Sequence, residues 1–232
     1  IGIVMPKTKD VFLDVYITQI LSGISDVTQD LDYRIMFFPF DYDKHQPGFY
    51  VSIARSNIVD GIILLKTRKD DEGIERLSQT NFPFILVNNK KYSNKISFVD
   101  SCNIKGAGLA VEHLYKLGHR KIAIVTGEMH ETNAIDRFNG YKKTMKKLKL
   151  PVRKEWIING KFSEETAYQA GKKLFESKKL PTAIFCSDDY MAIGVMKRIK
   201  EMGLSVPKDI SIVGFDDIEM SSYIKPSLTT IR

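Results

Sequence analysis

Short apolar runs alternate with longer segments of helical periodicity along almost the whole chain. Most of the runs are continuously apolar, which is the pattern of strands buried on both faces of a parallel sheet. Strands that alternate with helices in this way are typical of stacked β-α-β units. The sequence therefore predicts a doubly wound α/β fold with parallel sheets. The predicted strands are 1–5, 34–39, 61–65, 84–87, 121–126, 183–186 and 210–215.

Two of the predicted helices have clear ends. The helix over 103–117 stops at Gly118, and the helix over 188–202 stops at Gly203. Glycine adopts the left-handed conformation that commonly closes a helix, and the cations that follow Gly118 suit the negative helix end.

The segment 90–100 interrupts this rhythm. It is polar and has no full helix between two strand-like stretches. We therefore predict a boundary near 99–103 and two α/β subdomains, 1–99 and 103–228, each of a plausible size for one sheet with its helices.

Composition limits the possible classes of protein. Of the 232 residues, 43% are hydrophobic and 27% are charged, which is usual for a globular protein and excludes disorder, collagen and coiled coil. No apolar run approaches the roughly 18 to 20 residues needed to span a membrane. Cys102 and Cys186 show no disulfide or zinc-ligand spacing, so we expect a reducing, cytoplasmic location. The chain starts at Ile1 without a leader, and we expect a domain cut from a longer protein.

The net charge of +7 suggests a nucleic-acid partner, but the distribution of lysines argues against one. The densest basic cluster falls on one arc of a helix whose other arc is apolar. We interpret it as a solvated helix face, with a phosphate or acidic partner as the alternative. The lysines are Lys142, Lys143, Lys146, Lys147 and Lys149, and the apolar arc carries Phe138, Tyr141, Met145 and Leu148.

Common enzyme motifs are absent. The chain has no phosphate-binding GxxxxGK[ST] loop, GxGxxG turn, HExxH zinc motif or GxSxG elbow. None of the four histidines has a serine or cysteine at an informative spacing. The sequence therefore predicts no catalytic residue, no cofactor and no metal site.

Polar side chains instead follow several predicted strands. Asn88 follows 84–87, Asp188 follows 183–186, and Asp216 follows 210–215. Arg137 lies early in the helix after 121–126, one turn beyond Asn133. Ligands of open α/β sheets bind at the carboxyl ends of the strands, so we expect these groups to share one rim.

The chemistry of this set suits a polyhydroxylated ligand. Carboxylates and amides accept from hydroxyl groups, an arginine donates to two oxygens at once, and Phe162 or Tyr16 can cover an apolar face. Each residue also has a structural interpretation. Asp188 is a good helix N-cap, and Arg137 taken alone is an ordinary helix residue. Asp216 and Asp217 can form a simple loop pair or an acidic metal rim.

Several longer stretches together resemble the effector-binding core of the lactose-repressor (LacI/GalR) family of bacterial transcription regulators. The resemblance covers nearly the whole chain. The stretches are VDGIILL at 59–65, EHLYKLGHRKIAIVTG at 112–127, RFNGY at 137–141, FSEETAY at 162–168, PTAIFCSDDYMAIGVM at 181–196, VPKDISIVGFDDI at 206–218 and PSLTTIR at 226–232.

The resemblance implies two subdomains like those of type I periplasmic binding proteins, with a ligand cleft between them. It also implies a homodimer and an N-terminal helix-turn-helix headpiece that reads operator DNA. The headpiece is not in this sequence, and residues 229–232 would begin a crossover back to the first subdomain.

The resemblance also assigns roles to residues of the predicted rim. Arg137 matches an arginine that clamps sugar hydroxyls, Asp216 a carboxylate that binds the same ligand, and Phe162 an aromatic that stacks on the sugar. Asp188 stands where the family usually has Asn, and Asn88 where it usually has Asp. Three further pocket residues are implied: Asn133, and Asp14 and Tyr16 from a first loop that departs from the family pattern.

The sequence thus predicts the effector-binding and dimerisation domain of a LacI-type repressor, not an enzyme, that senses a sugar or a related small metabolite. A periplasmic sugar-binding protein of an ABC transporter is the alternative, and an α/β enzyme on the same scaffold is a third reading. The sequence leaves three questions open: which effector binds, whether it acts as an inducer or a corepressor, and whether a phosphocarrier partner binds.

Overall fold

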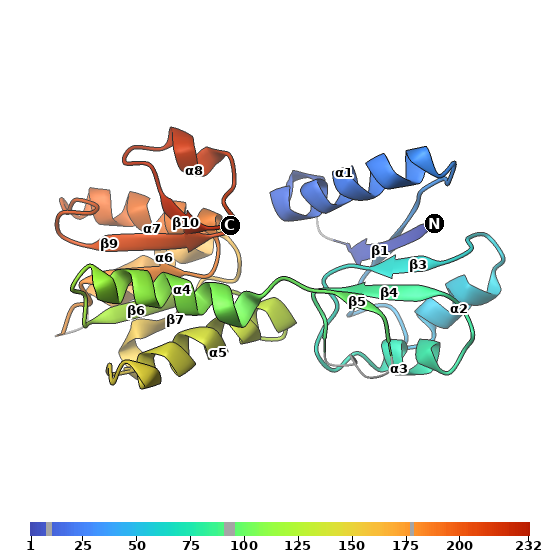
Figure 1. The fold of residues 1–232 in the computed structure, drawn as a ribbon, viewed down its shortest axis with the longest axis horizontal. Coiled ribbons are helices and arrows are strands. Elements are labelled where there is room, and N and C mark those ends of the chain that lie inside the picture. Colours follow the sequence, from blue (N-terminus) through green and yellow to red (C-terminus); the bar gives the residue numbers. More distant parts are fainter. Residues whose placement is uncertain (8–10, 91–95, 177–178) are drawn as a thin grey trace. The chain divides into compact units, whose positions relative to one another are not determined.

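The chain forms two compact units, Ile1–Ser101 and Cys102–Arg232. The computed structural model describes residues 1–7, 11–90, 96–176 and 179–232. Each unit contains a five-stranded sheet whose paired strands are all parallel, with helices on its faces (Figure 1). This arrangement confirms the predicted fold class of two doubly wound parallel sheets.

The sheet of the first unit has the strand order β2-β1-β3-β4-β5. Gly2 of β1 pairs with Met36 of β2 on one side and with Ile62 of β3 on the other. The elements are β1 (Gly2–Pro6), a 3₁₀ turn η1 (Val11–Leu13), α1 (Val15–Asp30), β2 (Met36–Phe40), α2 (Phe49–Arg55), β3 (Ile62–Leu64), α3 (Glu72–Ser78), β4 (Phe84–Val87) and β5 (Phe98–Val99).

Alternate residues of these strands face opposite helices, as the two-residue period of a strand requires. Val4 packs with residues of α2 and α3, whereas its neighbours Ile3 and Met5 pack with Ile17 of α1. The continuous apolar run of β1 is therefore buried on both faces, as expected for an inner parallel strand.

The second unit has the strand order β10-β9-β8-β6-β7. Residues 229–232, assigned from the sequence to a crossover, include β10, which pairs with β9. The elements are α4 (Asn103–Lys116), β6 (Ile122–Thr126), α5 (Thr132–Lys147), η2 (Lys154–Trp156), β7 (Ile157–Asn159), α6 (Glu164–Phe175), β8 (Ala183–Cys186), α7 (Asp189–Glu201), β9 (Ser211–Phe215), α8 (Met220–Tyr223) and β10 (Thr229–Ile231).

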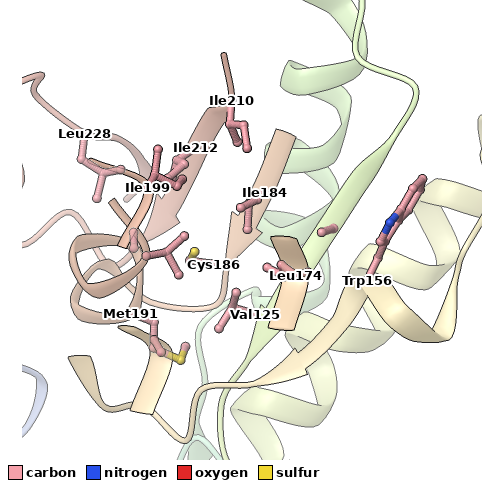
Figure 2. Close-up of a cluster of buried hydrophobic side chains, with 14 residues drawn as sticks. Val125, Trp156, Leu174, Ile184, Cys186, Met191, Ile199, Ile210, Ile212 and Leu228 are labelled. Atoms are coloured by element: carbon pink, nitrogen blue, oxygen red, sulfur yellow. The ribbon is translucent and has the colours of Figure 1, made fainter. Parts of the chain in front are cut away.

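Two apolar layers hold this second sheet between its helices. Val125 and Ile184 pack with Met191 of α7 in the layer that Figure 2 shows. Ile124 precedes Val125 and Phe185 follows Ile184, and both pack in the opposite layer, which contains residues of α4 and α5. The strand ends are thus fixed from both sides, which gives the residues that follow them defined positions.

The predicted helix ends are confirmed. The helix α4 closes at Gly118, which has φ of +95°, with His119 N donating to Leu114 O and Gly118 N donating to Tyr115 O. This pair of bonds is a Schellman motif. Gly203, with φ of +76°, follows α7 in the same way.

The predicted exposure of the lysine face is also confirmed. The lysines of the basic cluster are exposed, whereas Tyr141 and Met145 of α5 are fully buried. Lys147 pairs with Glu112 of α4 at 3.0 Å, so part of this positive charge is balanced within the unit.

Three short strands were missed by the sequence analysis: β5, β7 and β10. They have two or three residues each, and Phe98, Val99, Asn159 and Thr229 within them are exposed. Edge strands of this length carry little of the apolar signal by which buried strands are recognised.

Candidate functional site

The carboxyl ends of the parallel strands of the second unit meet at one edge of the sheet. Asp188 follows β8, Asp216 follows β9, and Gly127 follows β6. This edge is where open α/β sheets bind ligands. We call Arg137, Asp188 and Asp216 the polar cluster.

Arg137 is the best-anchored member of the polar cluster. Its side chain is 3% exposed, and its terminal nitrogens donate to the two carboxylate oxygens of Asp216 at 2.9 and 3.4 Å. Its Nε donates to Asn103 Oδ1 at 2.8 Å, and one terminal nitrogen also donates to the carbonyl oxygen of Ser187. The guanidinium carbon lies 3.8 Å from the ring centroid of Phe215. Arg137 is therefore a buried, multiply bonded group and not a solvated helix residue.

The backbone holds Asp216 in an unusual conformation. Its φ is 103°, a region that favours glycine, and its N–H donates to Ile231 O of β10 at 2.8 Å. A non-glycine residue in such a region costs roughly 1 to 3 kcal/mol and is often found at ligand sites. The side chain of Asp216 keeps partial exposure, at 24%. The carboxylate can thus reach a ligand while it holds Arg137.

Asp188 is both a helix cap and a member of the polar cluster. Its Oδ1 accepts from Met191 N at 2.6 Å at the start of α7, which confirms the capping interpretation. The residue is 7% exposed. Burial, with the negative charges of Asp216 and Asp189, raises the pKa of Asp188 to about 7 against the lowering effects of Met191 N–H and Arg137.

Asp189 has a structural role that the sequence did not reveal. Its carboxylate accepts from Ile218 N at 2.9 Å, from Ser221 Oγ at 2.9 Å and from Thr230 Oγ1 at 2.6 Å. These bonds join α7 to α8 and β10. Burial raises its pKa, although the three donors oppose the rise.

Phe162 lies between β7 and α6, and Asn133 lies on α5. Phe162 has φ of 53°, and its ring covers Gly127 so closely that an added Cβ there would lie 2.0 Å from the ring. Asn133 is buried on α5, one turn before Arg137, so the two residues share a helix face. The structure gives neither residue a hydrogen bond to the polar cluster among the described residues.

The predicted site residues of the first unit come together around a lysine. Lys66 Nζ lies 2.5 Å from Asp14 Oδ2 and 5.8 Å from the ring centroid of Tyr16. Asn88 Nδ2 donates to the Tyr16 hydroxyl, and Asn88 Oδ1 accepts from Ser101 at 3.3 Å. Asp14 also caps α1. We call Asp14, Tyr16, Lys66 and Asn88 the lysine cluster.

Sequence reasoning missed Lys66 and Asn103. Lys66 follows β3 at its carboxyl end and has φ of 50°, so the same strand-end argument that selected Asn88 would have found it. Asn103 is the first residue of α4 and is fully buried. Its polar side chain at the start of an apolar helix face was the available signal.

Two negative findings concern metals and membranes. Among the described residues, no three histidine, cysteine, aspartate or glutamate side chains are grouped to hold a metal ion. The described part of the chain also contains no helix that is long and apolar enough to cross a membrane.

Comparison with known proteins gives consistent matches. Residues 111–232 match the family model of the periplasmic binding protein-like domain. The chain is 31% identical over 218 residues to the HTH-type transcriptional repressor PurR of Haemophilus influenzae, with 94% of this chain and 65% of the relative covered. It thus spans about 65% of the length of that curated relative.

Solved structures match over 99% of this chain. A regulatory protein of the LacI family from Chloroflexus aggregans is 30% identical, with a TM-score of 0.87 and 82% of that chain covered. A sugar-binding transcriptional regulator of the LacI family from Escherichia coli, solved with phosphate, is 25% identical, with a TM-score of 0.84 and the same share of its chain covered.

Proposed function

Because this chain belongs to the LacI family of regulatory proteins and contains a periplasmic binding protein-like domain, we propose that it is the effector-binding and dimerisation part of a transcriptional repressor. Its effector is a sugar or a related small metabolite. The repressor acts in the cytoplasm and binds operator DNA through a helix-turn-helix segment outside this sequence.

The observation that carries the proposal is the ion pair of buried Arg137 with partly exposed Asp216, beside Asp188. It presents a fixed guanidinium and two carboxyl groups at the carboxyl edge of a parallel sheet. Such a set accepts and donates hydrogen bonds at fixed positions, as recognition of a polyhydroxylated molecule requires. One structural relative is itself a sugar-binding regulator, which favours the same ligand class here.

The lysine cluster of the first unit supplies the other proposed effector contacts. Lys66 and Tyr16 donate, whereas Asp14 and Asn88 accept, so this cluster also matches hydroxyl groups. An effector shifts a conformational equilibrium only if it binds one state more tightly than another. We propose that the contacts of the effector with its binding residues provide this difference and so change operator affinity.

The alternatives have less support. The relatives named above are repressors and regulators, which disfavours a periplasmic transport protein. An enzyme needs a nucleophile, a metal set or a cofactor loop, and neither cluster contains an activated nucleophile.

Thermal unfolding with a panel of sugars, sugar phosphates, purines and amino acids tests the proposal. A ligand at about 100 times its dissociation constant adds about 2.7 kcal/mol of stability. For a protein of this size the melting temperature then rises by about 5 to 10 °C. A shift confined to one sugar class supports the proposal, and a shift confined to compounds without hydroxyl groups refutes the sugar assignment.

A further inference from the structure

The polar cluster and its neighbour Asp189 together contain more carboxyl groups than one cation can neutralise. Four elements bring titratable or charged groups to Asp188: Arg137 on α5, Asp216 after β9, Asp189 on α7 and Cys186 on β8. Arg137 is the one cation among them, and burial keeps the Cys186 thiol uncharged by raising its pKa. Three carboxyl groups therefore share a single positive charge.

Two of the three carboxylates have partners that stabilise their negative charge. Asp216 binds the guanidinium of Arg137 with both oxygens. Asp189 accepts from one backbone N–H and two hydroxyl groups. Charged hydrogen bonds of this kind are roughly twice as strong as neutral ones, so these contacts offset part of the cost of burying the two carboxylates.

Asp188 has the weakest support for a negative charge. Its Oδ1 accepts one backbone N–H, and no donor among the described residues contacts its Oδ2. The side chain is nevertheless nearly buried. Burial of an ionised carboxylate costs desolvation free energy, and this cost is avoided if the carboxyl group of Asp188 keeps its proton.

We propose that Asp188 works as a neutral carboxylic acid, with Oδ2–H as a hydrogen-bond donor to an oxygen atom of an uncharged, hydroxyl-rich effector. This inference rests on the proposed effector site and specifies its chemistry. Oδ1 caps α7 and Oδ2 carries the proton, so a single side chain holds the helix and reads the ligand.

The net charge of the polar cluster and Asp189 determines which class of effector can bind. With Asp188 neutral, Arg137, Asp216 and Asp189 sum to one negative charge. An anionic ligand such as a sugar phosphate is repelled, whereas a neutral sugar is not. Ionisation of Asp188 removes the donor, so the affinity for a neutral sugar falls by about tenfold for each pH unit above the midpoint of its titration.

The proton itself can be observed without any ligand. Aspartate carboxyl carbons are labelled with ¹³C, and the Asp188 resonance is assigned by its absence in Asp188→Asn. Burial and the neighbouring carboxylates place the expected midpoint near pH 7, against about 4 for an ordinary aspartate. A midpoint below about 5 overturns the proposal.

The donor role is tested with the sugar that gives the largest thermal shift, by calorimetry at about pH 6 and about pH 8.5. We expect the wild type to lose at least tenfold in affinity between these pH values, and Asp188→Asn, whose amide still donates, to show no change. Asp188→Ser keeps a helix cap but removes the second polar atom, so this variant should bind the sugar weakly at both pH values.

The outcomes separate this inference from the proposed function. A wild-type affinity that is flat with pH overturns the donor role even if a sugar binds. If no sugar binds although the Asp188 carboxyl titrates near neutral pH, the sugar assignment is wrong, and the protonation of Asp188 is still supported.

Discussion

The guanidinium of Arg137 donates to both carboxylate oxygens of Asp216, which joins α5 to the loop after β9. The two residues are 79 positions apart in the chain. The same arginine binds Asn103 at the start of α4 and the carbonyl of Ser187. The side chain of Arg137 therefore connects α5 to the start of α4 and to the loops that follow β8 and β9.

Removal of Arg137 should damage stability as well as effector binding. In Arg137→Ala, the carboxylate of Asp216 loses its cation and Asn103 loses its donor. Breaking a fully buried pair costs about 3 to 5 kcal/mol, and the partial exposure of Asp216 places this loss toward the lower end. Denaturant unfolding measures the loss. Lys147→Ala is the matched control, because it removes an exposed ion pair from the same helix and should cost less than about 1 kcal/mol. Equal losses in the two variants would contradict the structural role of Arg137.

Stability should fall as pH rises from about 4 to about 7. In this window the folded protein keeps the proton of Asp188, whose pKa is raised to about 7, while the unfolded chain has released it. The slope from one such group approaches about 1.4 kcal/mol per pH unit. Asp189, whose pKa is also raised, contributes in the same direction.

Urea unfolding of the wild type and Asp188→Asn over this pH window isolates the share of Asp188. The variant should show the shallower slope and be relatively more stable at the upper end. Parallel curves would mean that Asp188 is ionised in the folded protein.

Gly127 is required by its contact with Phe162. In Gly127→Ala the new Cβ would lie 2.0 Å from the aromatic ring, so the ring must move, at a cost of about 1 to 3 kcal/mol. The melting temperature should fall. Gly23→Ala in α1 is the control, because no heavy atom lies within 4 Å of its added Cβ. That exposed helical glycine should gain about 0.5 to 1 kcal/mol on replacement. A neutral Gly127→Ala would show that Phe162 does not pack there.

The sequence predicted the inner strands and the helix ends because each is a local signal. The apolar run of β8 and the glycines after α4 and α7 needed no tertiary information. The strand-end argument brought Asp188, Asp216 and Arg137 to one edge. It did not predict the bonds of Arg137 to Asn103 and Ser187, because these depend on how helices pack on the sheet. The short edge strands gave little apolar signal.

No sequence motif indicated a role for Lys66. Its role can be tested by substitution. Lys66→Met keeps the length of the side chain and removes the charge that faces Asp14. Because both side chains are partly exposed, stability should change by less than about 1 kcal/mol. Effector affinity should fall, since the lysine cluster loses its cationic donor. Arg34→Met, which removes an exposed partner of Asp32, should leave affinity unchanged. Equal affinities in both variants would remove Lys66 from the site.

The most direct test of the account compares two carboxylates that flank the same strand. Asp216 lies after the carboxyl end of β9, whereas Asp209 lies before its amino end and accepts from Ser205 N at 2.8 Å. Calorimetric titration with the most effective sugar gives the affinity of the wild type, Asp216→Asn and Asp209→Asn. We predict that Asp216→Asn weakens binding by about 10-fold or more, as loss of a charged hydrogen bond implies, and that Asp209→Asn binds like the wild type. Equal affinity in all three proteins would contradict an effector site at the carboxyl edge of the second sheet.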